Sequence, residues 1–262
     1  MKPIHSFAYL VVIYLLVQAL GLAVGAGMIT GIKEGVIEPA VPQGESPKTS
    51  INIFAYVVAF TAVLLILFKL GLDIIITVVT YFALYAGVFI TFTTLMGDAG
   101  FIASIPYYIT SLILRKNTVI SNLTLVFTIA GIGGFLGASL AVFPALLLIL
   151  ILSAYDLIAV FGTKHMVTLA TKAKGKIPFM FLIPVKDRQL GLGTGDLTIP
   201  LVFTVSVLRD YTLAHATLTS LGGLAGLTIL FNHALKKEGT PLPALPPITI
   251  GLFLGYMTSL IL

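Results

Sequence analysis

The stretch that decides the fold is Asn117–Tyr155, NTVISNLTLVFTIAGIGGFLGASLAVFPALLLILILSAY, which lies between Lys116 and Asp156. Its 39 residues carry no charge, whereas one helical crossing of a bilayer needs about 20 apolar residues. The stretch is therefore long enough for two crossings. The glycine-rich segment Gly131–Gly137 near its middle predicts a turn between them.

The composition of the whole chain agrees with a membrane protein. Of 262 residues, 58% are hydrophobic and only 10% are charged, against about 25% charged residues in soluble domains. The spanning elements are predicted to be helices, because the strands of a membrane β-barrel would alternate in polarity at every second residue. The absence of cysteine excludes disulfides, thiolate metal sites and cysteine nucleophiles.

Apolar runs elsewhere in the chain predict seven further spans, so that the fold class is an all-α polytopic membrane protein with nine transmembrane helices. The seven runs are 6–29, 51–68, 72–96, 99–114, 190–208, 211–235 and 245–262. They form one integrated membrane domain, with a six-span half at 1–163, a basic loop at 164–189 and a three-span half at 190–262. Three glycine pairs four residues apart are interpreted as helix-packing faces: Gly21 and Gly25, Gly133 and Gly137, and Gly222 and Gly226.

The distribution of basic residues predicts the orientation. With nine spans, twelve of the fifteen Lys and Arg residues fall on one side of the membrane and three on the other: Lys33, Lys48 and Arg209. Cytoplasmic loops collect Lys and Arg, so we expect a multi-pass protein of the cell membrane with its N-terminus in the cytoplasm and its C-terminus outside. The net charge of +5 then reports orientation, and we infer no nucleic-acid partner from it.

Two acidic residues are predicted to lie inside the bilayer. Eight of the ten can sit in loops or at span ends, but Asp156 lies eight residues before Lys164 and Asp196 lies eight residues after Arg188. At 1.5 Å per residue both carboxyls are about 12 Å from the cytoplasmic face. No basic residue of the same spans lies within two turns, so each carboxyl is the natural partner of the other.

Two carboxyls in a low-dielectric site cannot both ionise cheaply, so one member keeps its proton near neutral pH. The ionised member can activate water as a general base, while the protonated member donates to a peptide carbonyl oxygen. This is the chemistry of an aspartic protease, and it needs no cofactor and no metal. A proton- or cation-coupled transporter, an ion conduit or a structural pair would use the same depth-matched carboxyls, and these alternatives stay open on depth alone.

Short motifs surround these aspartates in chain order. Tyr155 precedes Asp156 in span six, Gly193-Thr194-Gly195 precedes Asp196 in span seven, and Pro243-Ala244-Leu245 opens span nine. Together they resemble the presenilin and signal peptide peptidase family of intramembrane aspartyl proteases. The resemblance covers the chain and implies a compact microbial or archaeal homologue, because the long acidic loops of eukaryotic presenilins are missing.

The resemblance also implies roles for the motif residues. Asp156 and Asp196 would be the catalytic pair. The residues that shape the site and bind substrate would be Tyr155, Gly193, Thr194, Gly195, Pro243, Ala244 and Leu245. Thr194 departs from the leucine usual in presenilins, so substrate preference does not carry over. The implied partners are transmembrane-helix peptides and the lipid bilayer, and the oligomeric state stays open.

A substrate helix must be unwound before water reaches its peptide bonds. We hypothesise that an extended segment near 177–185 or 240–243 pairs with the unwound chain as an added strand. A serine protease built on Ser139 with His215 or His233 is disfavoured, because Ser139 falls near an outer turn. A metalloprotease is disfavoured because no His begins a His-Glu-x-x-His pattern.

Overall fold

The computed structural model describes residues 3–163, 180–185, 188–236 and 242–261. These residues form nine α-helices, one short π-helix and two strands. The elements are α1 (Pro3–Lys33), α2 (Pro47–Lys69), α3 (Asp73–Met96), α4 (Asp98–Ile113), α5 (Thr118–Ser139), α6 (Val142–Ile158), η1 (Ala159–Thr163), β1 (Met180–Val185), β2 (Arg188–Gly193), α8 (Gly195–Asp210), α9 (Leu213–Lys236) and α10 (Leu245–Ser259).

Six of the described helices are long and apolar enough to cross a membrane: α1, α2, α3, α5, α6 and α9. The other three, α4, α8 and α10, have 16, 16 and 15 residues. Each of the nine helices coincides with a predicted span to within a few residues, apart from the end of α5 and the start of α8. The predicted fold class, a helical polytopic membrane protein, is therefore confirmed.

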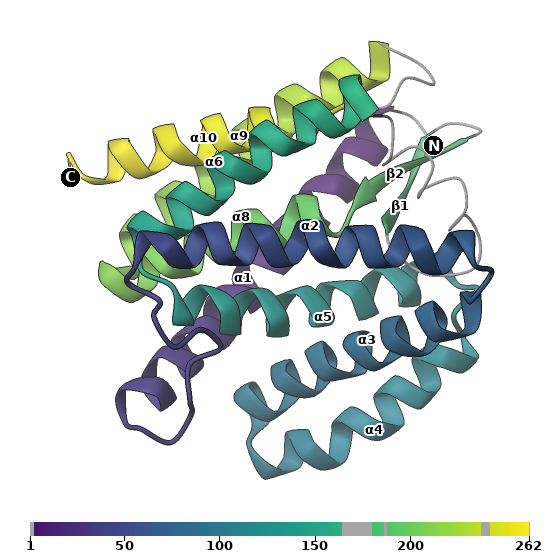
Figure 1. The fold of residues 1–262 in the computed structure, drawn as a ribbon, viewed down its shortest axis with the longest axis horizontal. Coiled ribbons are helices and arrows are strands. Elements are labelled where there is room, and N and C mark those ends of the chain that lie inside the picture. Colours follow the sequence, from purple (N-terminus) through teal and green to yellow (C-terminus); the bar gives the residue numbers. More distant parts are fainter. Residues whose placement is uncertain (1–2, 164–179, 186–187, 237–241, 262) are drawn as a thin grey trace.

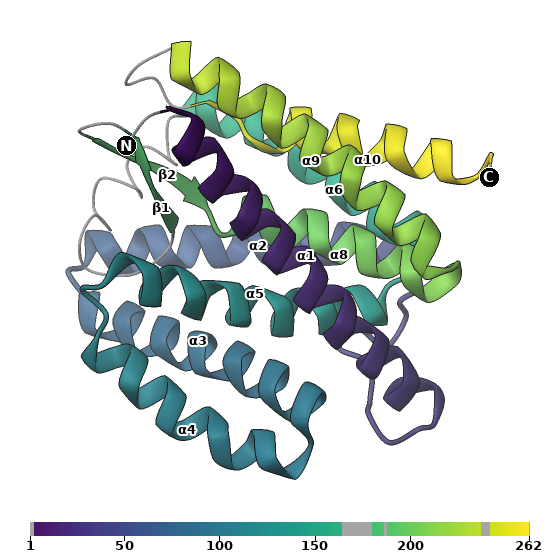
Figure 2. The same cartoon turned by 180° about the vertical axis from the view of Figure 1, so that it is seen from behind.

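Helix α8 lies at the centre of the molecule. It packs against α1, α5, α6, α9 and α10, and every residue from Pro200 to Val207 is buried. Figures 1 and 2, which view the molecule from opposite sides, show α1 running obliquely across α5 and α8. Helix α2 contacts chiefly α6 and α3 and is the outermost element of the face that Figure 1 shows. A helix that is apolar on all sides suits either place, in the core or in lipid.

Close helix packing depends on the paired glycines. A Cβ on Gly21 would overlap the side chain of Leu201, and one on Gly25 would overlap Val205. A Cβ on Gly222 of α9 would collide with the backbone of α10. The prediction that these glycine pairs form packing faces is confirmed.

The glycine-rich segment Gly131–Gly137 is not a turn, so that prediction is wrong. It lies within α5, and the chain breaks afterwards at Leu140 and Ala141, whose backbones are extended. The glycines persist in the helix because neighbouring helices approach closely: a Cβ on Gly131 would collide with the Gly87 carbonyl oxygen of α3, and one on Gly137 would lie 2.7 Å from the Val202 carbonyl oxygen of α8. Packing outweighs the weak helix propensity of glycine here.

The predicted start of span seven at Leu190 is also wrong. Residues 188–193 form β2, which pairs antiparallel with β1 from Met180 opposite Gly193 to Val185 opposite Arg188. Side chains of β1 are alternately half-buried and buried, and this period of two is that of a strand with one covered face. Helix α8 therefore begins only at Gly195.

Candidate active site

Asp156 lies near the end of α6 and is only 6% exposed. Its Oδ2 atom accepts a hydrogen bond of 3.1 Å from the backbone N–H of Leu245, and the Ala244 N–H adds to this interaction. Leu245 is the first residue of α10, and N–H groups in the first turn of a helix have no partner within that helix. The start of α10 therefore places backbone donors and the positive end of a helix dipole at this carboxylate.

Asp196 lies in the first turn of α8. Its Oδ2 atom accepts a hydrogen bond of 3.1 Å from the backbone N–H of Gly193 at the end of β2. A Cβ on Gly193 would stand 2.9 Å from that same oxygen. A side chain at 193 would thus force the Asp196 carboxylate to move from this position. No left-handed backbone is involved, since the described glycines with positive φ are Gly35, Gly71 and Gly97.

The two carboxyls share one site. Asp156 and Asp196 interact electrostatically, and the helices that carry them pack against each other and against α10. Each carboxyl comes from a different helix and is held by a backbone N–H from a different segment. The arrangement can therefore hold an acid and a base side by side at fixed positions.

The remaining predicted site residues lie around this pair in different ways. Tyr155 packs edge to face against Phe54 of α2, with ring centroids 5.8 Å apart. The Thr194 carbonyl oxygen accepts the first helical hydrogen bonds of α8, and Gly195 is exposed with open space where a Cβ would lie. Pro243, which is half-buried, directly precedes the Ala244–Leu245 donors.

The strand β1 has a partner on each edge. Its inner edge pairs with β2. On the outer edge the side-chain amide of Asn122 on α5 accepts from the Leu182 N–H at 3.1 Å and donates to the Leu182 carbonyl at 2.9 Å. Because both backbone groups of Leu182 face Asn122, the opposed pair of Leu182 and Gly191 is one without cross-strand hydrogen bonds.

This alternation fixes which groups of β2 face away from β1. Residues two positions along either strand belong to the same class of pair, so Gln189, Gly191 and Gly193 direct their backbone N–H and C=O groups outward. The Gly193 N–H accordingly reaches Asp196. Within the described part of the chain, the outward groups of Gly191 bind no other residue. Among the described residues, the outer edge of β2 is therefore open at Gly191, two residues before the Gly193 N–H that binds Asp196.

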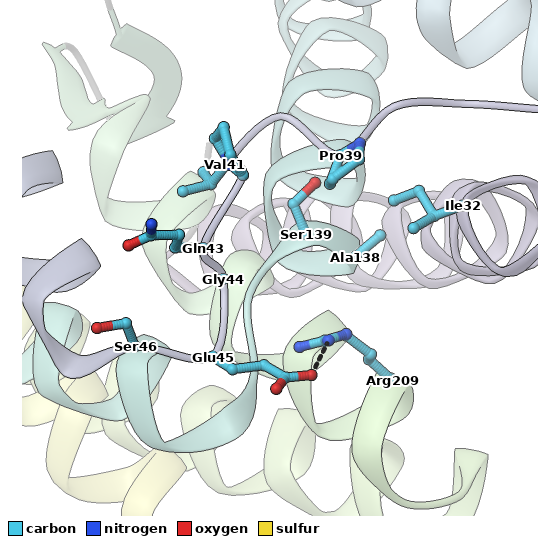
Figure 3. Close-up of a pocket in the computed structure, with 11 residues that line it drawn as sticks. Ile32, Pro39, Val41, Gln43, Gly44, Glu45, Ser46, Ala138, Ser139 and Arg209 are labelled. Carbon is cyan, nitrogen blue, oxygen red and sulfur yellow. Dashed lines mark hydrogen bonds and ion pairs between the residues drawn. The ribbon is translucent and has the colours of Figure 1, made fainter. Parts of the chain in front are cut away.

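A cavity of about 370 Å³ lies at the opposite end of the bundle. Figure 3 shows it among the ends of α1, α5 and α8 and the segment that joins α1 to α2. Ser139 borders this cavity, accepts from the Ala40 N–H and donates to the Phe135 carbonyl. His215 instead pairs with Thr212 at 2.8 Å. Ser139 thus has a structural role, which argues against a serine protease.

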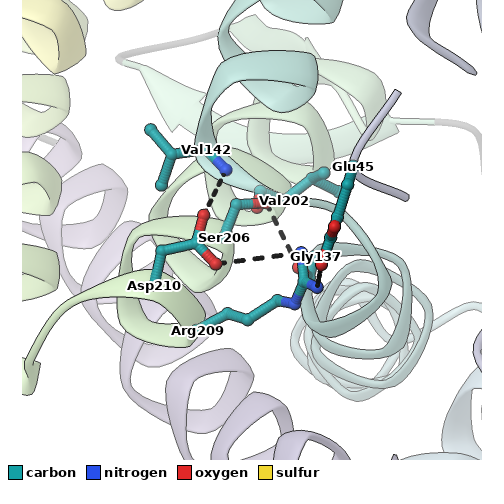
Figure 4. A network of polar contacts seen from close by, with 7 residues as sticks. All are labelled: Glu45, Gly137, Val142, Val202, Ser206, Arg209 and Asp210. Carbon is teal, nitrogen blue, oxygen red and sulfur yellow. Dashed lines mark hydrogen bonds and ion pairs between the residues drawn. The ribbon is translucent and has the colours of Figure 1, made fainter. Parts of the chain in front are cut away.

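A polar network borders the same cavity. Figure 4 shows Arg209 of α8 paired with Glu45 at 3.3 Å, and Asp210 accepting from the Val142 N–H at 2.8 Å. The Asp210–Val142 contact joins the end of α8 to the start of α6, and these are the ends of the two helices that lie away from the aspartates. No group of three His, Asp or Glu side chains suited to a metal ion occurs among the described residues.

Comparison with protein families identifies the class. Residues 10–189 match the family described as "Signal-peptide peptidase, presenilin aspartyl protease". The chain belongs to this family. The matched range includes Asp156 and ends shortly before Gly193 and Asp196. No curated protein matches the chain.

Solved structures resemble the protease in fold. One presenilin family intramembrane aspartate protease, solved in space group C222, has a TM-score of 0.72 and 22% identity, with 100% of this chain and 99% of that chain covered. Another, solved in space group P2, has a TM-score of 0.69 and 23% identity, with 95% of each chain covered. By its family the protein is an intramembrane aspartic endopeptidase, as the resemblance implied.

Proposed function

We propose that Asp156 and Asp196 are the catalytic pair and that the protease hydrolyses peptide bonds within transmembrane segments of membrane proteins. The observation that carries this proposal is that Asp156 and Asp196 interact electrostatically and lie on α6 and α8, which pack against each other and against α10. Two aspartates beside the bond to be cut are what aspartic-protease chemistry needs. The residues that hold them, Gly193 and Leu245, belong to two of the three motifs on which the family resemblance rests.

The proposed reaction uses the two carboxyls in opposite protonation states. The ionised carboxylate removes a proton from a water molecule as that water attacks the peptide carbonyl carbon, and the protonated carboxyl donates to the carbonyl oxygen. The tetrahedral intermediate then collapses. A proton passes to the leaving amide nitrogen, the C–N bond breaks, and the pair returns to one proton shared between two groups. The backbone donors Gly193 and Leu245 keep both carboxyls in place throughout.

Substrate unwinding follows from the same geometry. An unwound segment needs new partners for its backbone groups inside the membrane, and an open strand edge supplies them. The extended segment expected near 177–185 corresponds in part to β1, whose outer edge is already bound by Asn122. Residues 177–179, and 240–241 of the second expected segment, lie outside the described residues. We therefore assign the added strand to the outer edge of β2, which leads directly to Asp196.

The remaining expected roles belong to the same proposal. Gly195 leaves room for the substrate backbone beside Asp196, and Thr194, Tyr155 and the 243–245 segment shape the site. The excess of twelve basic residues over three supports a cytoplasmic N-terminus in the cell membrane, which places the aspartates nearer the cytoplasmic face.

The test is cleavage of a single-span substrate by purified protease in detergent. We expect defined fragments from the wild type, and rates at least about 100-fold lower from Asp156→Asn and Asp196→Asn, because general acid–base catalysis contributes at least that much. Asp98→Asn is the matched control, since Asp98 is exposed at the start of α4, and it should cleave like the wild type. If both active-site variants cleaved normally, the carboxyls would not be catalytic, and proton or cation flux in liposomes would be measured next.

A further inference from the structure

Asn122 is a polar residue buried in an apolar helix, and its side-chain amide forms hydrogen bonds with β1 and with α1. It is 3% exposed. Its Nδ2 donates to the Leu182 carbonyl at 2.9 Å and to the Tyr9 hydroxyl at 3.0 Å, while its Oδ1 accepts from the Leu182 N–H at 3.1 Å. One side-chain amide thus replaces the peptide group of a neighbouring strand, with one donor and one acceptor to the same residue.

A second buried side chain occupies the same edge of β1. Ser6 of α1 has no exposed surface, and its hydroxyl donates to the Pro184 carbonyl at 2.5 Å. Pro184 has no N–H of its own. Together Asn122 and Ser6 therefore satisfy all outward backbone groups of Leu182 and Pro184. No further strand can add on this side of the hairpin without displacing them.

The hairpin is also fixed by the packing of one face of β1. Phe181, Ile183 and Val185 are each at most 2% exposed, and β1 contacts α1 and α5. The helices α1 and α5 in turn pack against α8. Consequently the position of β1, the register of β2 and the first turn of α8 are tied to the same pair of helices.

We propose that Asn122, assisted by Ser6, is a positioning residue of the protease: it closes the outer edge of β1 and fixes the hairpin, so that β2 is the edge that receives the unwound substrate in one register. This inference rests on the proposed function, because it concerns how substrate reaches Asp196. It adds a residue that lies outside all the sequence motifs of the site. The role is one of position, since Asn122 touches β1 and not the aspartates.

Loss of the Asn122 amide should change where the substrate is cut. In Asn122→Leu the N–H and C=O of Leu182 lose both partners, and a group left unpaired in the interior seeks another. The hairpin can then shift, or substrate can pair with β1. Because side chains alternate along a strand, a slip of the substrate strand by two residues leaves each side chain on the same face of the sheet, whereas a slip by one residue does not. We therefore expect new cleavage sites two residues away from the main wild-type site.

The experiment compares Asn122→Leu with Thr128→Val on the same helix. The Thr128 hydroxyl is also buried and donates to a backbone carbonyl, that of Leu84 on α3, at 3.1 Å. Both variants lose buried hydrogen bonds of α5, but only Asn122 serves the hairpin. Product ends are identified by mass spectrometry, kcat and KM are measured with the single-span substrate, and thermal unfolding is followed by circular dichroism.

We expect kcat/KM of Asn122→Leu to fall about 10-fold or more, the factor that corresponds to about 1.4 kcal/mol, with altered product ends. Thr128→Val should keep the wild-type ends. Wild-type ends and kcat/KM in Asn122→Leu, or the same altered ends in Thr128→Val, would overturn the inference. If Asn122→Leu does not fold, Ser6→Ala takes its place with the same expectation and the same contrary outcomes. Loss of cleavage in Asp156→Asn and Asp196→Asn tests the proposed function separately, so the two failures are distinguishable.

Discussion

At the scale of single residues, Gly193 and Gly195 have different physical reasons to be glycine. Gly193 lies beneath the carboxylate of Asp196, and a Cβ there would stand 2.9 Å from Oδ2. Gly193→Ala should therefore displace the carboxylate and lower kcat by about 10-fold or more, equivalent to about 1.4 kcal/mol of transition-state stabilisation. The measurement is kcat for the single-span substrate, with Tm as the check on folding.

Gly195 is the contrasting case at the same scale. A Cβ there would meet no atom within 4 Å, and alanine is the better helix former by about 1 kcal/mol. Gly195→Ala should thus unfold at the same or a higher Tm than the wild type, yet show a raised KM, because the added methyl group occupies space that the substrate backbone needs. A wild-type KM would show that substrate does not pass over Gly195.

At the scale of elements, the C-terminal end of α8 stabilises the start of α6. Helix α6 begins after Ala141, which offers no side-chain cap, and Asp210 of α8 accepts the Val142 N–H instead (Figure 4). A carboxylate at a helix N-terminus contributes about 0.3–1 kcal/mol, and up to about 2 when partly buried. Asp210→Asn should lower the free energy of unfolding by about 1 kcal/mol, measured by denaturant titration with circular dichroism, since the chain has no Trp.

Glu45→Gln is the control for this prediction. The Glu45 side chain is 84% exposed in its pair with Arg209, and exposed ion pairs contribute little. The control should match the wild type to within about 0.5 kcal/mol. Equal losses in both variants would place the stabilisation in the ion pair and not at the start of α6.

The elements also show what a single sequence can reveal. The nine helices follow from apolar runs, because only a run of that length can satisfy its backbone in lipid. The break after α5 could not be predicted from the glycines, since Gly133 and Gly137 lie in the helix to make room for Leu201 and Val205 of a helix far along the chain. The hairpin was not predicted from the sequence for a similar reason. Strand β2 contains Gly191 and Gly193, which weaken a strand by propensity, and its register depends on Asn122. The aspartate pair was predictable because burial of a charge in lipid demands a partner.

At the scale of the whole molecule, the surface is that of a protein solvated by lipid. Large apolar side chains on α2 and α3 are widely exposed, among them Tyr56, Ile74 and Phe82 at 73%, 79% and 72%. In water an apolar surface of this extent would lead to association, whereas a bilayer accepts it. The polar features gather instead at the two ends of the bundle, the aspartates with the hairpin at one end and the Arg209 network at the other.

The two ends of the bundle should therefore face different sides of the membrane, and the lack of cysteine makes this directly measurable. Val36, after α1, is 78% exposed, and Leu70, between α2 and α3, is 65% exposed. In intact cells a membrane-impermeant maleimide should label Val36→Cys at once and Leu70→Cys only after permeabilisation, because the basic loops hold the Leu70 side in the cytoplasm. The reverse pattern would invert the protease and place its aspartates nearer the outer face, and labelling of both positions in intact cells would contradict the assigned spans.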